Sequence, residues 1–419
     1  MKKYISIAFT CILFLVQNSF GQNITLEECV KKAIENYPLV KQNELLELTA
    51  NIQSDNLSKL WFPQVQIAGQ ATYQSDVTGL PIKLPNVEIP KLSKDQYKLF
   101  AEINQSIYDG GWNQAQKKLI TGNTTIEHEK INVELYRIKE KVEQLFFGIL
   151  MIREQKKQLQ LLVSDLLAAL QKTNVAVKNG IALQLSADLI QVEILKQNQR
   201  MTELNASESG FIDALELFVQ MQLNNNFTFV TPTLAQQLNE LKRPELQLYE
   251  TQKNLFLAQS DILRSKTMPR LNLFAQAGYG RPALNMLSNS FDPYAIGGLR
   301  LNWNISSFYT YKKETRLLDL QRQQIDIQKE VFTFQTKVQQ AQQDAEIKKI
   351  SQLIQQDDEI ISLRKTIKNT AQVQLDNGVI QTDDYLRYTN AEDQAIQNKI
   401  VHQMQWMMAI YNYNHLTGN

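Results

Sequence analysis

Apolar side chains alternate with amide and other polar side chains along four short stretches of the chain, residues 64–75, 97–108, 270–280 and 294–305. In the first and third stretches the apolar positions include Val65, Ile67, Ala71, Tyr73, Leu271, Leu273, Ala277 and Tyr279. A period of two predicts β-strands with one apolar and one polar face. About ten residues are enough for a tilted strand to span a bilayer. One such strand alone would indicate a soluble two-faced sheet, but four predict membrane strands whose apolar face contacts lipid.

Two much longer segments, residues 113–178 and 311–376, carry apolar residues at a spacing of three and four. These are Leu135, Ile138, Val142, Leu145, Ile149, Ile152, Leu159, Leu162 and Leu166, and then Ile347, Ile350, Ile354, Ile360, Leu363 and Ile367. The spacing predicts coiled-coil seams on helices about 100 Å long. Asn179-Gly180 and Asn377-Gly378 follow, and Asn-Gly predicts a turn. We therefore expect return helices over residues 183–221 and 382–416, which complete helical hairpins at 109–222 and 308–417.

The two halves of the chain repeat each other. Pro38 and Pro244, like Tyr73 and Tyr279, lie 206 positions apart. The offset becomes 198 between Asn179-Gly180 and Asn377-Gly378, because the first strand-to-strand loop is longer. We interpret residues 22–223 as a first repeat, 224–243 as a linker and 244–419 as a second repeat. Helices are also expected over 25–36, 38–60 and 244–265, since proline favours a helix start.

The chain begins with the features of a secretory signal peptide over residues 1–21, namely Lys2 and Lys3 followed by an apolar run and small residues before Gln22. Cys29 is then the one mature cysteine, and we expect it to be a small buried residue on the first helix. Lys and Arg together number 44 against 43 acidic residues, which argues against a nucleic-acid partner.

Chemistry-bearing residues do not cluster in this sequence. The three histidines, His128, His402 and His415, are scattered without a ligand spacing, so no metal site is expected. No nucleophile elbow, phosphate loop or pair of catalytic carboxylates is found. We therefore expect neither an enzyme nor a cofactor.

Four membrane strands cannot close a barrel by themselves, and open sheet edges are not tolerated in lipid. The smallest bacterial barrels have eight strands. The chain must therefore oligomerise, and three copies would supply twelve strands and twelve long helices. Aromatic residues gather where strand meets helix, among them Trp61, Trp112, Trp303 and Tyr309. This placement is that of an interfacial belt, although a packed aromatic core at the joint would look the same.

The signal peptide, the duplication, the strand pairs and the long helical hairpins together resemble the TolC family of outer-membrane efflux proteins over essentially the whole mature chain. In that family a glycine at the helix turn is followed six residues later by aspartate, as Gly378 is by Asp384 here. The first repeat departs from the pattern with Ser186. Some members have a second aspartate one turn on, where this chain has Arg387.

The resemblance implies a mainly α fold with a transmembrane β-barrel portion, in which each repeat contributes long coiled-coil helices and two strands. The homotrimer would have a twelve-stranded barrel in the outer membrane of a Gram-negative bacterium and a twelve-helix periplasmic tunnel. It would dock onto a periplasmic adaptor and an inner-membrane pump, and act as a passive exit duct for drugs, metals or proteins. A non-conducting structural or adhesive coiled-coil envelope protein is the alternative.

Two groups of residues become candidates for sites at the tip. Asp383, Asp384 and Arg387 are candidates for a periplasmic gate, although an aspartate in this position is also favoured by the helix dipole alone. Asn179, Gly180, Asn377 and Gly378 are candidate contacts for the adaptor, although as turn residues they need no such role. The sequence does not identify the cargo.

Overall fold

The computed structural model describes residues 23–79, 92–223, 227–233 and 240–418. The predicted signal peptide and part of the predicted linker lie outside these residues. The chain divides into two compact units. We call them the helical unit, from residues 1–40, 131–244 and 332–419, and the sheet unit, from residues 41–130 and 245–331. Each unit takes residues from both halves of the predicted duplication.

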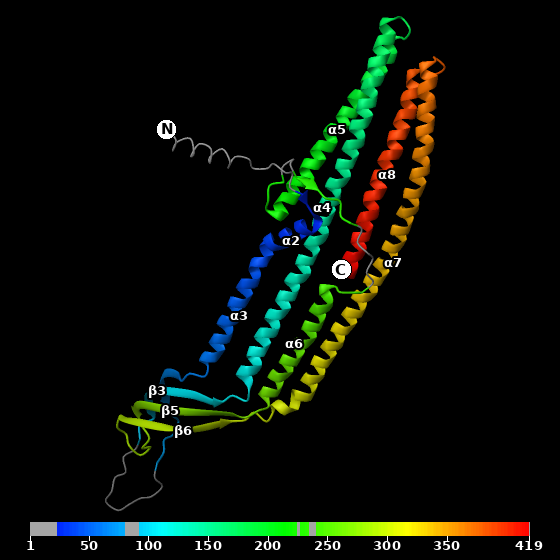
Figure 1. Cartoon of the computed structure of the whole chain (residues 1–419). Helices are drawn as coiled ribbons and strands as arrows, with labels where there is room; N and C mark the ends of the chain where they lie inside the picture. Colours follow the sequence, from blue (N-terminus) through cyan, green and yellow to red (C-terminus); the bar gives the residue numbers. More distant parts are fainter. Residues whose placement is uncertain (1–22, 80–91, 224–226, 234–239, 419) are drawn as a thin grey trace, which may run out of the picture. The chain divides into compact units, whose positions relative to one another are not determined.

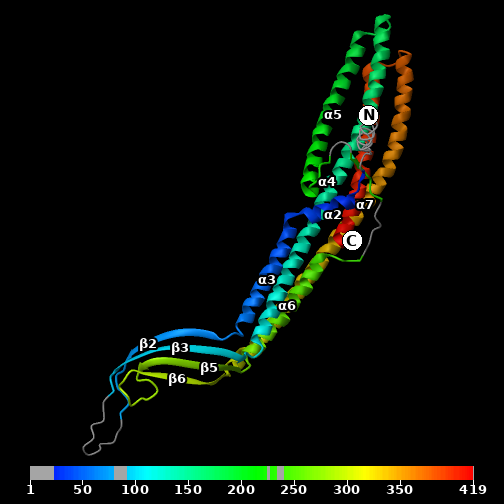
Figure 2. The same ribbon diagram turned by 60° about the vertical axis from the view of Figure 1, so that its left-hand side comes forward.

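The sheet unit contains a four-stranded antiparallel sheet in the order β2-β3-β5-β6. Figure 2 shows the strands side by side, with β2 and β6 at the two edges. Their bounds are Gln64–Tyr73 for β2, Asp95–Tyr108 for β3, Arg270–Arg281 for β5 and Asp292–Asn302 for β6. All four predicted strands are therefore present. The last strand ends at Asn302 rather than at 305, because the carbonyls of Asn304 and Ile305 accept i+3 bonds that lead into the next helix.

The strand register places the alternating apolar residues in rows across the sheet. Ala101 of β3 pairs with Ile67 of β2 and Ala277 of β5, and Ala277 pairs in turn with Ala295 of β6. Directly opposed residues point to the same side of a sheet. The predicted apolar positions of β2 and β5 therefore share one face with their partners on β3 and β6.

The helices of the sheet unit are α3 (Lys41–Lys59), α6 (Pro244–Lys266) and the first parts of α4 (Trp112–Lys178) and α7 (Ser307–Asp376). A short 3-10 turn, η1 (Pro38–Val40), precedes α3, so the predicted helix from Pro38 begins with a tighter turn. At the start of α4, the Asp109 carboxylate accepts a hydrogen bond from the backbone N–H of Asn113 at 2.7 Å. This bond satisfies one of the amides that a helix start leaves unpaired.

The helical unit contains α2 (Leu26–Asn36), α5 (Gln184–Val219), α8 (Thr382–Thr417) and the remaining parts of α4 and α7. In Figure 1, α5 runs beside α4 and α8 beside α7. A two-residue strand β1 (Asn23–Ile24) pairs in parallel with β4 (Thr228–Phe229), which the sequence did not predict. None of the helices in the described part of the chain is long and apolar enough to cross a membrane.

The core of the helical unit lies where α2, α4 and α5 meet. Val142, Phe146 and Leu215 are fully buried there, and so is Cys29, as predicted for a small residue of the first helix. Thr25 and Glu28 form a reciprocal capping box at the start of α2. The cap fixes the start of the helix that carries Cys29 into the core.

The two predicted coiled-coil seams differ. On α4 the seam is buried at most of its positions, including Val142, Leu159 and Leu166. On α7 only the first three positions of the predicted seam are covered: Ile350 is buried, and Ile347 and Ile354 are half-buried. Ile360, Leu363 and Ile367 are exposed in the single chain, so the seam predicted at these three positions is not formed within it. The reason is that a different row of α7 residues faces the interior of the helical unit in this part of the helix, and this row contains the buried Asp357 and Ala371.

Candidate functional site

Each of the two helical hairpins has a turn at its tip, and the two turns have the same geometry. Gly180 and Gly378 have φ angles of 71° and 70°, in the left-handed region that glycine adopts without steric cost. In each copy the glycine N–H and the next N–H bond back to the last turn of the preceding helix, as in Ile181 N to Ala176 O at 2.8 Å. These are helix C-caps of the Schellman kind. The turns predicted from Asn-Gly are confirmed, whereas their role as adaptor contacts stays a prediction.

The candidate gate residues lie in the first turns of α8. Asp383 is exposed, and Asp384 is half-buried. Arg387 Nη2 donates to Asp384 Oδ1 at 2.8 Å, and the Arg387 guanidinium lies 5.2 Å from the Tyr388 ring centroid. The structure therefore brings Asp384 and Arg387 into direct contact. Both aspartates also lie at the helix N-terminus, where the dipole favours negative charge.

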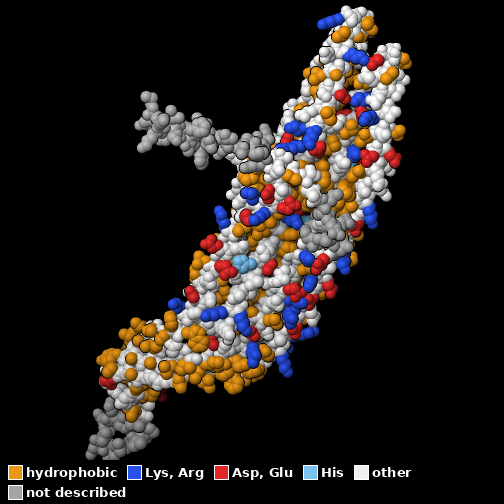
Figure 3. All heavy atoms as spheres, viewed as in Figure 1, with side chains coloured by type: hydrophobic (Ala, Val, Ile, Leu, Met, Phe, Trp, Pro, Cys, Tyr) orange, Lys and Arg blue, Asp and Glu red, His pale blue; other side chains and the backbone are white. Residues whose placement is uncertain are grey.

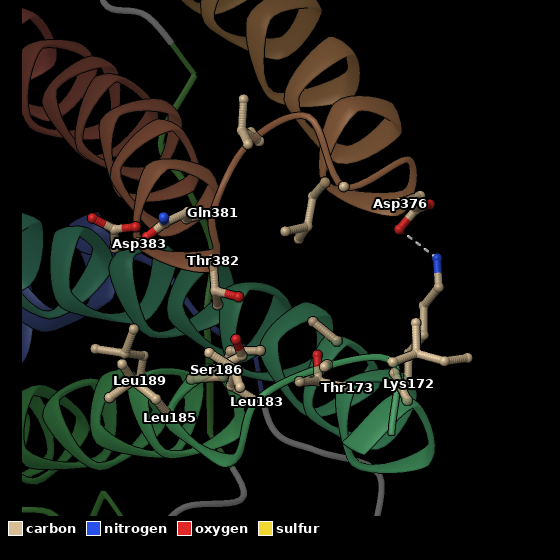
Figure 4. A pocket seen from close by; sticks show the side chains of 18 of the residues that line it. Lys172, Thr173, Leu183, Leu185, Ser186, Leu189, Asp376, Gln381, Thr382 and Asp383 are labelled. Carbon is tan, nitrogen blue, oxygen red and sulfur yellow. Dashed lines mark ion pairs between the residues drawn. The ribbon is translucent and has the colours of Figure 1, made fainter. Parts of the chain in front are cut away.

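A groove of about 540 Å³ opens between the tips of the two hairpins. Figure 4 shows its walls, which come from the ends of α4 and α5 on one side and from the turn between α7 and α8 on the other. Asp383, Thr382 and Ser186 line it, and Ser186 is the residue that departs from the family pattern. Lys172 and Asp376 also line it and form an ion pair at 2.6 Å that joins α4 to α7. The hydrogen bond from Lys172 lowers the pKa of Asp376 below its ordinary value.

Below the tip, a half-buried cation joins three helices. Lys368 of α7 lies 2.9 Å from Glu392 of α8 and 3.2 Å from Asp165 of α4. Burial alone would lower the pKa of Lys368, but its bonds to Glu392 and Asp165 outweigh burial and raise that pKa. Lys368 was not singled out from the sequence. In the sequence, the one feature that could have pointed to it is its place directly after Ile367, an apolar position of the predicted seam.

A second buried polar contact reinforces this junction. Asp393 of α8 accepts a hydrogen bond from Gln158 of α4 at 3.3 Å and lies 3.5 Å from Arg200 of α5. Burial raises the pKa of Asp393 more than these two partners lower it. The two hairpins are thus connected by charged and polar groups within one chain.

The two faces of the sheet have opposite chemistry. Val65, Ile67 and Tyr73 are 66%, 78% and 79% exposed on the apolar face. Hydrophobic side chains gather over the strands on the side of the molecule that Figure 3 shows. The opposite face carries Glu102, which accepts a hydrogen bond from Asn104 at 2.8 Å and lies 3.5 Å from Arg300. The predicted division into one apolar and one polar face is confirmed.

Comparison with solved structures places this architecture among known folds. The outer-membrane protein VceC of Vibrio cholerae superimposes with a TM-score of 0.66 at 13% identity, over 94% of this chain and 96% of that one. The CmeC outer-membrane channel of Campylobacter jejuni matches with a TM-score of 0.64 at 13% identity, over 94% of this chain and 85% of that one. The chain has the fold of an outer-membrane channel.

The open-state MtrE outer-membrane channel of Neisseria gonorrhoeae agrees, with a TM-score of 0.65 at 12% identity, over 94% of this chain and 89% of that one. No protein-family model matches the sequence, and no curated protein matches it significantly. At these identities the likeness concerns the fold. The resemblance drawn from the sequence is confirmed at that level.

Proposed function

We propose that the chain is a TolC-family channel-tunnel of a Gram-negative outer membrane, the passive exit duct of a tripartite efflux or secretion system. The observation that carries this proposal is the exposed apolar face of the four-stranded sheet, backed by a polar face that carries Glu102 and Arg300. A strand with lipid on one side and water on the other requires this division. The protein acts without catalysis, because the pump supplies the driving force.

The duct is a homotrimer, and two features of the described residues support this. Both β2 and β6 are edge strands of the sheet, and lipid does not tolerate open edges. The long helices also expose apolar stripes at helical spacing, which single soluble helices do not retain. On α3 and α7 the stripes are Leu45, Leu48, Ile52, Leu317, Leu320, Ile327, Val331, Phe334, Val338, Ile360, Leu363 and Ile367. Three copies would pair the edges into a twelve-stranded barrel and cover the stripes.

The decisive experiment combines mass and conductance. Native mass measurement of the purified protein in detergent should give a trimer, and the trimer should conduct single-channel current in planar bilayers. A stable folded monomer would contradict the assembly. A trimer without conductance would favour the alternative, a structural or adhesive coiled-coil protein of the envelope.

The tip groove is the proposed contact for the periplasmic adaptor, which in turn binds the inner-membrane pump. Its apolar wall and its position beside both turns suit a helical hairpin from a partner. A photo-cross-linking residue in place of Leu183, which lines the groove and is 73% exposed, should capture the adaptor in cells. The same cross-linking residue in place of exposed Lys141, which lies on α4 far from the tip, should not capture it. Capture of the adaptor from position 141 alone would move the contact away from the tip.

A further inference from the structure

Arg281 is a charged residue on the apolar face of the sheet. It ends β5 and pairs in register with Tyr97 of β3, whose side chain belongs to that face. Its guanidinium lies 5.6 Å from the Tyr97 ring centroid and 5.1 Å from the Phe291 centroid. Such cation–π contacts hold a guanidinium in a fixed orientation on an otherwise apolar surface.

Asp95 holds one edge of this guanidinium. Arg281 Nη2 forms an ion pair with a carboxylate oxygen of Asp95 and donates a hydrogen bond to the Asp95 backbone carbonyl at 3.3 Å. A guanidinium has five N–H donors, so one carboxylate does not satisfy it. Arg281 Nε has no hydrogen-bond partner among the described residues, and 20% of the side chain remains exposed. The arginine therefore retains donor capacity for an acidic group.

An apolar hollow of about 450 Å³ lies beside this arginine on the same face. Its floor includes Gly69 and Ala71 of β2, and the space is left by the missing side chain of Gly69 and the single methyl group of Ala71. Leu99, Tyr97, Tyr279 and Phe291 form the walls. The Phe291 ring stacks with Tyr279 at 5.9 Å and with Tyr97 at 6.3 Å between centroids. The hollow and the Arg281 guanidinium thus share two aromatic side chains.

The position of Arg281 along the strand fixes its depth in a membrane. From Leu271 to Tyr279 the apolar face of β5 extends about 26 Å at 3.3 Å per residue, close to the apolar band of about 25 Å in outer-membrane barrels. Arg281 lies just beyond this band, at the strand end opposite the one that follows α6. Because the proposed function directs the helices into the periplasm, Arg281 reaches the headgroups of the outer leaflet.

We propose that Arg281 and the hollow form a binding site for an anionic, phosphate-bearing lipid of the outer leaflet. One acyl chain occupies the hollow over Gly69 and Ala71, and the lipid phosphate accepts hydrogen bonds from Arg281. A neutral lipid would fill the hollow but would leave the arginine donor unused. The inference rests on the proposed function, because only an outer-membrane protein exposes this face to such a lipid.

The test measures lipid retained by the purified trimer in native mass spectra. The probes are an acylated glucosamine disaccharide with two phosphates and the same glycolipid without phosphates. Arg281→Gln should reduce binding of the phosphorylated glycolipid by about tenfold, as for one lost bond to a charged group, and leave binding of the other unchanged. Gly69→Leu fills the hollow and should reduce binding of both. Arg300→Gln, on the polar face, is the matched control and should reduce neither.

Equal retention of the phosphorylated glycolipid by wild type and Arg281→Gln would overturn the proposal, and so would an equal loss in Arg300→Gln. Trimer mass and conductance are recorded on the same samples. A conducting trimer with unchanged lipid binding in all variants refutes the lipid site and leaves the proposed function standing. A non-conducting monomer refutes both.

Discussion

Arg387 follows Asp384 by about one turn of α8, and its Nη2 atom lies 2.8 Å from Asp384 Oδ1. The arginine therefore compensates the charge of the aspartate that the family resemblance singles out as a gate residue. Asp383 beside it remains exposed and lines the tip groove. Each chain thus presents two carboxylates and one guanidinium at this point. A trimer that brings three such groups around one axis would concentrate carboxylates there, with part of their charge already neutralised.

We predict that this pairing sets the sensitivity of the channel to divalent cations. Asp384→Ala should weaken divalent-cation block of single-channel current, because it removes a carboxylate from the ring. Arg387→Ala should strengthen the block, because it frees that carboxylate. Asp213→Ala removes an exposed carboxylate from α5 away from the tip and serves as the control. If block in planar bilayers is the same in all variants, Asp384 is a helix-start carboxylate and the gate lies elsewhere.

The two faces of β5 should respond differently to the same substitution. Ala277 lies on the apolar face, where arginine near the membrane midplane costs about 2–4 kcal/mol. Gln276 lies on the opposite face and pairs in register with Glu102, which an arginine would complement. We expect Ala277→Arg to reduce the yield of assembled trimer and Gln276→Arg to leave it unchanged. Equal yields on denaturant-free gels would argue against membrane strands.

The sheet could be predicted from the sequence because the strand period of two is a local property. Ile67 and Ala277 each occupy an apolar position within an alternating run, whatever the strands pair with. The pairing of β3 with β5, which joins the two repeats, has no such local signal. Neither does the pairing of β1 with β4, since two residues carry no period.

On α7 the apolar pattern predicted a seam but not its partner. Ile360, Leu363 and Ile367 keep the spacing of a coiled coil, yet they face outward in the single chain. Periodicity identifies an apolar stripe and does not say whether that stripe meets the same chain or another copy. The tip turns, in contrast, follow from Asn-Gly alone, because their geometry is local.

The ion pairs that join separate helices of the helical unit had no local signal, because their partners are far apart in sequence. Lys368 and Asp165 are 203 positions apart, and nothing near either residue indicates the other. We predict that Lys368→Met destabilises the protein by about 3 kcal/mol, since it leaves buried Glu392 without its cation. Urea unfolding followed by circular dichroism measures this. Lys365→Met, at an exposed position three residues earlier, should have little effect. Similar losses in both variants would mean that the triad has no special role.

Replacing the unpaired Glu392 carboxylate by a neutral amide should restore part of the stability that Lys368→Met loses. In the double variant Lys368→Met with Glu392→Gln, the carboxylate that lost its partner is replaced by an amide. We expect the double variant to be more stable than Lys368→Met alone in the same urea titration. A double variant as unstable as the sum of the two single variants would show that Lys368 and Glu392 act independently.

Glu143 of α4 is a buried carboxyl group with an unusual titration. Its side chain is 3% exposed, and its Oε2 atom has no hydrogen-bond partner within the described residues. Burial raises the pKa of Glu143 to about 7, more than Lys139 lowers it, and nearby Glu140 adds to the rise. Tyr411 of α8 responds to the same charge, since burial, Glu27 and Glu143 together raise its pKa to about 12.

The raised pKa of Glu143 makes stability fall as pH rises. The unfolded chain loses this proton near the ordinary value of 4.5, whereas the folded chain keeps it until about 7. Between these values the folded state binds more protons, so each pH unit costs stability, and the loss reaches about 3 kcal/mol above pH 7. Glu143→Gln mimics the protonated form. It should therefore leave stability at pH 4 nearly unchanged and raise it at pH 8.

The measurement is the difference in urea unfolding midpoint between pH 4 and pH 8, for wild type and variant. Glu154→Gln is the control, because Glu154 lies on the same helix, partly exposed and paired with Lys157. Wild type and Glu154→Gln should lose stability between the two pH values, and Glu143→Gln should lose much less. If Glu143→Gln follows wild type, the carboxyl group acquires a partner in the assembled protein, and its proton is not what links stability to pH.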